Sequence, residues 1–124
     1  MYRKRTKKQQ LRGLADKLWY QKYLKGYCEV CGSSGGVLQG HHFFYRSSYG
    51  HLRYSPENHI TLCRACHFLL HFKGNPDIQQ RIIEKRGKKW YHKLRKEAFN
   101  KQKPSYQTIQ YYQNIIEQLN DKNQ

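Results

Sequence analysis

The chain has 124 residues, of which 37% are apolar, and 11 of its residues are tyrosines. It carries 24 Lys and Arg against 8 Asp and Glu, a formal net charge of +16 that favours a polyanionic partner, above all nucleic acid. We find no long apolar run, signal-peptide pattern or lipidation motif, which argues against a membrane partner, so we expect a cytoplasmic protein with a thin apolar core.

Residues 1–27 are predicted to form a basic N-terminal helical arm. They hold nine Lys or Arg and one Asp, and leucines recur among them at helical spacing. We expect a helix from about Lys8 to Lys25 that Gly26 ends, with its apolar side on the core and its basic side outward. A solvated charged face is the ordinary fate of such a run, but nine charges against one favour phosphate contact.

Residues 28–75 are predicted to form a chemically specialised core, because they hold only four Lys or Arg and two acids. Val37–Gln39 indicates a short strand that leads to a His-His pair, and a loop with turn signals follows. His59–Leu62 indicates a second strand, and Arg64–Phe72 has helical character up to the Gly-Asn-Pro stop that follows it.

Residues 76–124 are predicted to form a helical C-terminal extension. Helices are expected over Asp77–Arg86 and from Lys88 to about Lys101, and residues 76–104 carry ten Lys or Arg against three acids. The last stretch loses this charge and places apolar side chains from Ile109 to Leu119 along one helix face. This stripe either docks onto the body of the protein, which we favour, or forms a homodimer contact.

Four cysteines form two C-x-x-C pairs, Cys28 with Cys31 and Cys63 with Cys66. Closed structural zinc sites take four ligands, and two thiolate pairs are a preferred set. We therefore expect one structural Zn²⁺ that clamps the second strand and its helix to the first knuckle. Three other interpretations fit less well. Two disulfides would suit a secreted protein, and the c-type haem motif in Cys63–His67 requires export, but the sequence shows no signal-peptide pattern. A redox role is typical of isolated C-x-x-C pairs, not of two pairs that flank a histidine-rich loop.

Histidines cluster around the cysteine pairs. His67 and His71 lie four residues apart on a predicted helix, so their rings share one face. A lone histidine is usually a structural residue, and we interpret His59 in that way. The conjunction of an i,i+4 pair, the dipeptide His41-His42 and the adjacent zinc clamp instead indicates a second metal site.

The stretch from Cys28 to Phe72 resembles the HNH endonucleases, which are also called the ββα-metal nucleases. The likeness is carried by Gly40-His41-His42, by Asn58 and by Cys63-x-x-Cys66-His67. It implies an α+β fold with a small ββα-metal core and zinc-knuckle support, flanked here by basic N-terminal and C-terminal helices. It also implies metal-dependent hydrolysis of DNA phosphodiester bonds.

The same resemblance assigns residue roles. It makes His41, His67 and His71 the ligands of one catalytic divalent cation, His42 the general base, and Asn58 the residue that orients the base and holds the loop. An unperturbed histidine pKa near 7 suits such a base. The cation would be Mn²⁺, Ni²⁺, Co²⁺, Mg²⁺ or Zn²⁺. Because many family members have Asp at the position of His41, the all-imidazole set predicts better activity with Mn²⁺, Co²⁺ or Ni²⁺ than with Mg²⁺.

Contacts to DNA are expected from basic side chains of both arms and of the loop between the strands: Arg3, Lys4, Arg5, Arg46, Arg53, Lys88 and Lys89. Arg46 or Arg53 would also add positive charge near the transition state, with an ordinary backbone-phosphate contact as the alternative.

A second resemblance, to the phage Rap and NinG recombination nucleases, is carried by His51–Asn58, Ile82–Gly87 and Tyr106–Ile109. It implies branched DNA as the substrate and, for a phage-encoded protein, the host cytoplasm as the location. A homodimer would suit paired cuts in such DNA. The rival interpretations are a homing or nicking endonuclease that reads linear duplex, and a zinc-dependent DNA-binding protein without catalysis.

Overall fold

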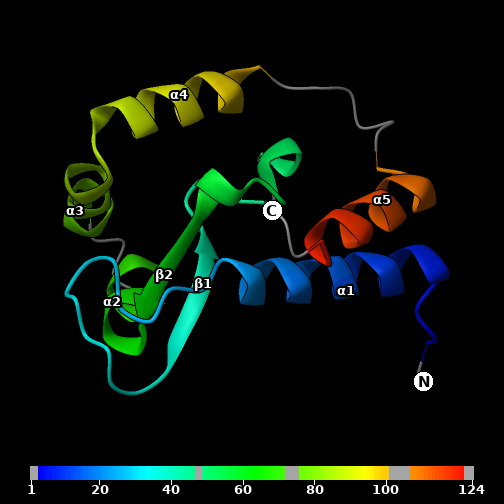
Figure 1. The fold of residues 1–124 in the computed structure, drawn as a ribbon, viewed down its shortest axis with the longest axis horizontal. Helices are drawn as coiled ribbons and strands as arrows, with labels where there is room; N and C mark the ends of the chain where they lie inside the picture. Colours follow the sequence, from blue (N-terminus) through cyan, green and yellow to red (C-terminus); the bar gives the residue numbers. More distant parts are fainter. Residues whose placement is uncertain (1–2, 47–48, 72–75, 101–106, 122–124) are drawn as a thin grey trace.

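A computed structural model describes residues 3–46, 49–71, 76–100 and 107–121 (Figure 1). The elements in chain order are α1 (Lys7–Lys22), β1 (Leu38–His42), β2 (His59–Cys63), α2 (Arg64–His71), α3 (Pro76–Arg86), α4 (Lys88–Phe99) and α5 (Ile109–Leu119), with short 3-10 helices at Gly50–Leu52 and Pro56–Asn58. The predicted α+β class is confirmed. None of the described helices is long and apolar enough to cross a membrane.

Strands β1 and β2 form an antiparallel hairpin, and α2 follows β2 without a break. In the register of the hairpin, His41 faces Ile60 and His42 faces His59. Because successive side chains of a strand point to opposite faces, His41 and His42 lie on opposite sides of the sheet. The first strand runs from Leu38 to His42, so the His-His pair lies at the end of the strand, as expected.

The α2 side of the hairpin carries one apolar cluster. Its buried members come from the first cysteine knuckle, β2, α2 and α3: Cys28, Val30, Ile60, Leu62, Cys66, Ile78 and Ile82. The side chains of Leu38, Phe43 and Trp90 pack against it. The zinc-knuckle residues therefore form part of the core itself, which suits a chain with few apolar residues.

Helix α1 packs along α5, and the two lie side by side in Figure 1 although the whole core separates them in sequence. A capping box at Thr6 begins α1. Tyr112 and Leu119 of α5 are buried with Ala15 and Trp19 of α1, so the C-terminal stripe docks within the chain, as we favoured.

The N-terminal helix differs from the prediction in two respects. It ends at Lys22 rather than Lys25, because the backbone N–H of Lys25 is engaged by the Thr61 hydroxyl of β2 at 2.9 Å. Its apolar side mostly covers α5, and its last turns reach the hairpin, where Trp19 stacks on His42 and Tyr20 contacts the same ring.

Helices α3 and α4 brace the long connection between the strands. Leu94 and Ala98 of α4 are buried with Leu52 of that connection, and Phe43, Phe44 and other aromatic rings pack around them. Gly87 joins the two helices at φ 99°, a left-handed conformation that glycine adopts without strain. The expected helix end near Lys101 lies outside the described residues, and α4 ends at Phe99.

Candidate metal centres and hydrolytic site

The four cysteines converge on one point. Their Sγ atoms all lie within 4.8 Å of one another, and the Sγ atoms of Cys31 and Cys63 are 3.7 Å apart. A tetrahedron with Zn–S bonds of about 2.3 Å places its sulfurs about 3.8 Å apart, so this cluster has the dimensions of a Zn–S₄ site. Among the described side chains it is the one group of three or more metal-binding residues, and the predicted four-cysteine site is confirmed.

Backbone geometry prepares the first knuckle for a metal. The N–H of Gly32 donates to the carbonyl of Cys28 at 2.9 Å, and Gly32 takes the left-handed φ of 78° that this tight turn requires. Burial alone would raise the pKa of the Cys28 thiol, but backbone hydrogen bonds from Cys31, Cys63 and Val30 lower that pKa to about 7. A thiol with this pKa readily supplies the thiolate that binds zinc.

Glu29, inside the first C-x-x-C pair, locks the knuckle to the rest of the core. Its carboxylate is 5% exposed and accepts the N–H of Thr61 at 2.7 Å. The guanidinium of Arg86 donates to both carboxylate oxygens, at 2.7 and 3.0 Å, and Lys25 adds a third partner at 2.8 Å. The sequence analysis missed this residue, although an acid between two cysteines in so basic a chain was a usable signal.

Two of the three predicted imidazole ligands meet on the α2 face of the hairpin. The ring centroids of His41 on β1 and His67 on α2 are 3.9 Å apart, with the ring planes tilted by 34°. His71 lies one turn further along α2, and its side chain is outside the described part of the structure. Imidazole nitrogens from a strand and a helix form a donor set that suits a divalent transition metal.

His42 lies on the other face, buried at 7% exposure against α1. Its ring stacks on Trp19, with centroids 4.2 Å apart and planes 10° from parallel. Its Nε2 is 2.8 Å from the carbonyl of Arg53 and its Nδ1 is 3.4 Å from the Tyr20 hydroxyl. Because a carbonyl only accepts, Nε2 carries the proton, and Nδ1 keeps the lone pair that a base requires.

The environment of His42 lowers its pKa to about 4, because burial disfavours the charged ring and the nearby guanidinium groups of Arg53 and Arg46 add to the effect. This corrects the pKa near 7 that we expected from the sequence. In this arrangement His42 is neutral at pH 7, so it is ready to accept a proton but is a weak base.

Asn58 is fully buried and holds the connection between the strands. Its Oδ1 accepts the N–H of Phe44 at 2.8 Å, and its Nδ2 donates to the carbonyls of Phe44 at 3.1 Å and Leu52 at 3.2 Å. Among the described hydrogen bonds, none joins Asn58 directly to His42. Any influence on the base therefore passes through the loop, which also carries the Arg53 carbonyl.

His59 and Gly40 form a tight contact beneath His42. His59 is 1% exposed, and its Nε2 donates to the carbonyl of Tyr20 at 3.0 Å. A Cβ added to Gly40 would lie 2.5 Å from that nitrogen. Gly40 is therefore required by the close approach of α1 and β2 to the first strand, and His59 has the structural role that the sequence suggested.

The predicted DNA contacts divide by exposure. Arg3, Lys4 and Arg5 are exposed before α1, Lys88 and Lys89 are exposed in the first turn of α4, and the Arg46 side chain is 51% exposed. Arg53 differs, because its side chain is 15% exposed and donates to both carboxylate oxygens of Asp16. Arg53 braces the loop, and no local sequence pattern indicates its pairing with Asp16.

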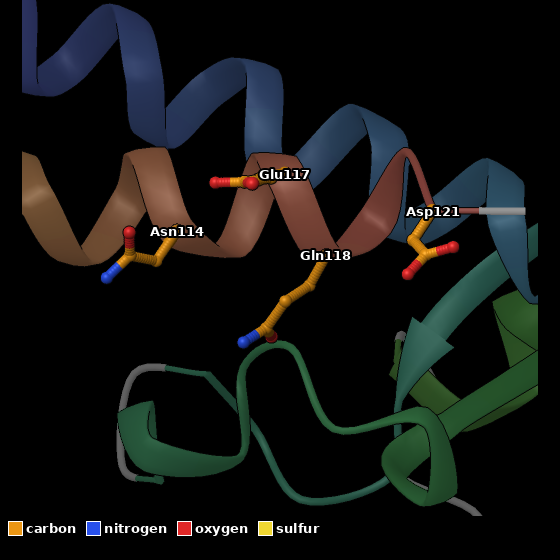
Figure 2. Close-up of a pocket in the computed structure, with 4 residues that line it drawn as sticks. All are labelled: Asn114, Glu117, Gln118 and Asp121. Atoms are coloured by element: carbon orange, nitrogen blue, oxygen red, sulfur yellow. The ribbon is translucent and has the colours of Figure 1, made fainter. Parts of the chain in front are cut away.

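A hollow on α5 has the opposite character. It is lined by acidic and amide side chains of α5 and of the residues just after it: Asn114, Glu117, Gln118 and Asp121 (Figure 2). Helix α5 contains no Lys or Arg. This face repels phosphate, and we assign it no part in binding a polyanion.

Residues 28–73 match the family model described as HNH endonuclease. The matched segment spans both cysteine pairs, both strands and α2. No curated protein and no solved structure matches the chain.

Proposed function

We propose that the HNH endonuclease domain formed by residues 28–73 hydrolyses phosphodiester bonds in DNA, with one divalent cation held by His41, His67 and His71 and with His42 as the general base. The observation that carries the proposal is the contact of His41 and His67, with ring centroids 3.9 Å apart, beside a preformed four-cysteine site. A hairpin and a helix that bring two imidazoles together favour metal binding over a purely structural role.

The two ions have different tasks. Four cysteines leave a zinc ion no open position, so the first ion maintains the fold. A cation on imidazoles keeps open positions, and when bound it polarises a phosphate oxygen and stabilises the oxygen that leaves. His41 on β1 and His67 on α2 would hold that cation, with His71 as the third ligand.

The base acts from the end of the same strand. The Arg53 carbonyl fixes the tautomer of His42, so Nδ1 is the atom that takes a proton from the attacking water. Approach of a phosphate anion raises the pKa of an imidazole, because an opposite charge favours the protonated ring. A phosphate anion close to the ring would therefore oppose the lowering of the His42 pKa that burial causes, whereas the charge of the cation would add to it.

The substrate we favour is branched or recombination-intermediate DNA. Basic residues flank the core on both sides, on the segment before α1 and on the first turn of α4, which suits strands that diverge from the site. The resemblance to the Rap and NinG nucleases supports the same substrate class. A sequence-reading nuclease on linear duplex and a zinc-dependent DNA-binding protein without catalysis are the alternatives that the experiment must separate.

The test compares zinc-loaded wild type with His42→Ala and His67→Ala on linear, nicked, forked and four-way DNA, with Mn²⁺ or Mg²⁺ added. We expect wild type to cut the branched DNA fastest, and His42→Ala to lose about 10²- to 10⁴-fold in cleavage rate while keeping zinc, fold and DNA binding. His92→Ala, an exposed histidine on α4, is the matched control and should cut normally. A His42→Ala protein that cuts at the wild-type rate would remove His42 as the base, and a wild type that binds but never cuts would leave the non-catalytic alternative.

A further inference from the structure

An arginine-lined hollow of about 290 Å³ lies at the amino end of α1, far from α2 in Figure 1. Its walls come from the start of the chain and from the connection between β1 and β2. The charged lining residues are Arg5, Arg12, Asp16, Arg46 and Arg53, and Gly13 forms part of the floor. The hollow shares no residue with the cysteine cluster or the imidazole pair.

The helix builds one wall by its periodicity. Arg12, Gly13 and Asp16 recur at spacings of three and four residues and so lie on one face of α1. Gly13 has no side chain that would project from this face into the hollow. A Cβ added there would lie 3.7 Å from a terminal guanidinium nitrogen of Arg5. Arg5 therefore folds back over the first turns of α1, and its charge lies in the hollow.

The charges in the hollow are not balanced. Asp16 is the one acid in its lining, and it is engaged by Arg53, whose Nε donates to Oδ1 at 2.7 Å. Arg46 approaches the same carboxylate at 3.6 Å. One carboxylate among four guanidinium groups leaves a local positive excess, and the planar fork of a guanidinium matches the oxygens of a phosphate.

We propose that this hollow binds one backbone phosphate of the DNA, on a nucleotide other than the one that is cut. The inference rests on the proposed function and identifies how its substrate is held. Arg53, whose side chain lines the hollow, also presents the carbonyl that holds Nε2 of His42 at 2.8 Å. Arg53 therefore links a phosphate bound among these arginines to the position of His42. The loop that carries Arg53 is held by Asn58, which donates to the carbonyl of Leu52.

The test uses a matched pair of substitutions at one position. Gly13→Ala adds a methyl group at ordinary contact distance, whereas Gly13→Glu adds a carboxylate that occupies the hollow in place of the phosphate. Both are made in the His42→Ala protein so that the DNA stays intact, and binding to a short labelled forked DNA is followed by anisotropy over a range of salt concentrations. We expect Gly13→Glu to bind several-fold more weakly than Gly13→Ala and the slope of log K against log salt to be smaller by about 1, the change for one lost phosphate contact.

Two further variants keep the result interpretable. Arg12→Gln removes one lining charge and should shift the salt slope in the same direction, even if Gly13→Glu fails to fold. Arg81→Gln, on an exposed face of α3, shows what loss of a charge outside the hollow does and should change the slope less. Equal slopes for Gly13→Glu and Gly13→Ala, or for Arg12→Gln and the parent protein, would overturn the proposal. This binding test does not depend on cleavage. A protein that never cuts DNA would refute the nuclease function, but it would not refute the phosphate site.

Discussion

The two faces of the β1–β2 hairpin are built in different ways. On the α2 face, the rings of His41 and His67 contact each other, and His67 follows β2 by only four residues. On the α1 face, His42 and His59 are buried under Trp19 and Tyr20, and each donates from Nε2 to a backbone carbonyl. One face brings two imidazole rings into contact, and the other fixes the orientation and tautomer of its rings.

The difference shows which parts of the chain each face depends on. The α2 face is assembled mainly from residues 28–73, which match the HNH endonuclease model, and Ile78 and Ile82 of α3 complete its buried cluster. The α1 face needs the N-terminal helix, which lies outside that match and is itself held by α5. His42 is therefore covered by a helix that the matched segment does not include, while the Arg53 carbonyl that holds its Nε2 lies within that segment.

Removal of zinc should have the largest effect, because it acts on both faces at once. Cys28 and Cys66 are members of the apolar cluster that supports the hairpin, and structural zinc in small domains contributes about 10–16 kcal/mol of apparent binding free energy. We expect a chelated sample, or a Cys63→Ser variant, to lose its cooperative thermal transition and its near-UV circular dichroism. A metal-free protein that melts at the same temperature would contradict this role.

Loss of Glu29 should have the second-largest effect on stability, and it should weaken the α2 face before the α1 face. Glu29→Ala removes the carboxylate partner of the partly buried Arg86, which keeps only backbone carbonyl acceptors, and we expect a cost of about 3 kcal/mol in the free energy of unfolding. Chemical denaturation of the zinc-loaded protein measures this loss. Glu84→Ala, an exposed acid on α3, is the matched control and should change stability little.

The same carboxylate predicts a pH dependence. Burial would raise the pKa of Glu29, but hydrogen bonds from Arg86 and Lys25 lower it below its usual value. The folded state therefore favours the carboxylate, and its contribution is present above the pKa of an unfolded Glu, about 4.3, and is lost as the pH falls through the lower folded value. The stability difference between wild type and Glu29→Gln should narrow in that acid range. A difference that stays constant with pH would exclude this linkage.

Gly40→Ala should damage the α1 face selectively. The added methyl group would meet the His59 ring at 2.5 Å and the backbone carbonyl of Tyr20 at 3.1 Å, and such overpacking costs about 1–3 kcal/mol. We expect reduced stability and a displaced α1, with the cysteine site intact, as measured by denaturation and by zinc stoichiometry. Gly35→Ala, which meets nothing within 4 Å, is the control. Loss of zinc from Gly40→Ala would show that the two faces are not separable.

The sequence predicted the α2 face well and the α1 face poorly, for a physical reason. The cysteine pairs are local patterns, so their spacing already indicates which sulfur atoms meet, and the four cysteines do converge. The cover over His42 depends on contacts between residues far apart in the chain, such as Trp19 with His42 and Arg53 with Asp16. No local pattern records such pairings, which is also why the pKa of His42 was expected near 7.

Tyr20→Phe should have the smallest effect and should sharpen the comparison, because it changes one hydroxyl of the α1 face. That hydroxyl lies 3.4 Å from Nδ1 of His42 and stabilises the neutral ring. Its removal should raise the pKa of His42 from about 4 by less than one unit, since hydrogen bonding to the neutral form disfavours protonation and a contact of this length is weak. Stability should change by no more than about 1 kcal/mol. An NMR titration of the histidine ring protons measures the shift, with Tyr91→Phe on α4 as the matched control. If His42 titrates at the same pH in both variants, burial under Trp19 alone sets its pKa, and the hydroxyl of Tyr20 has no part in tuning the base.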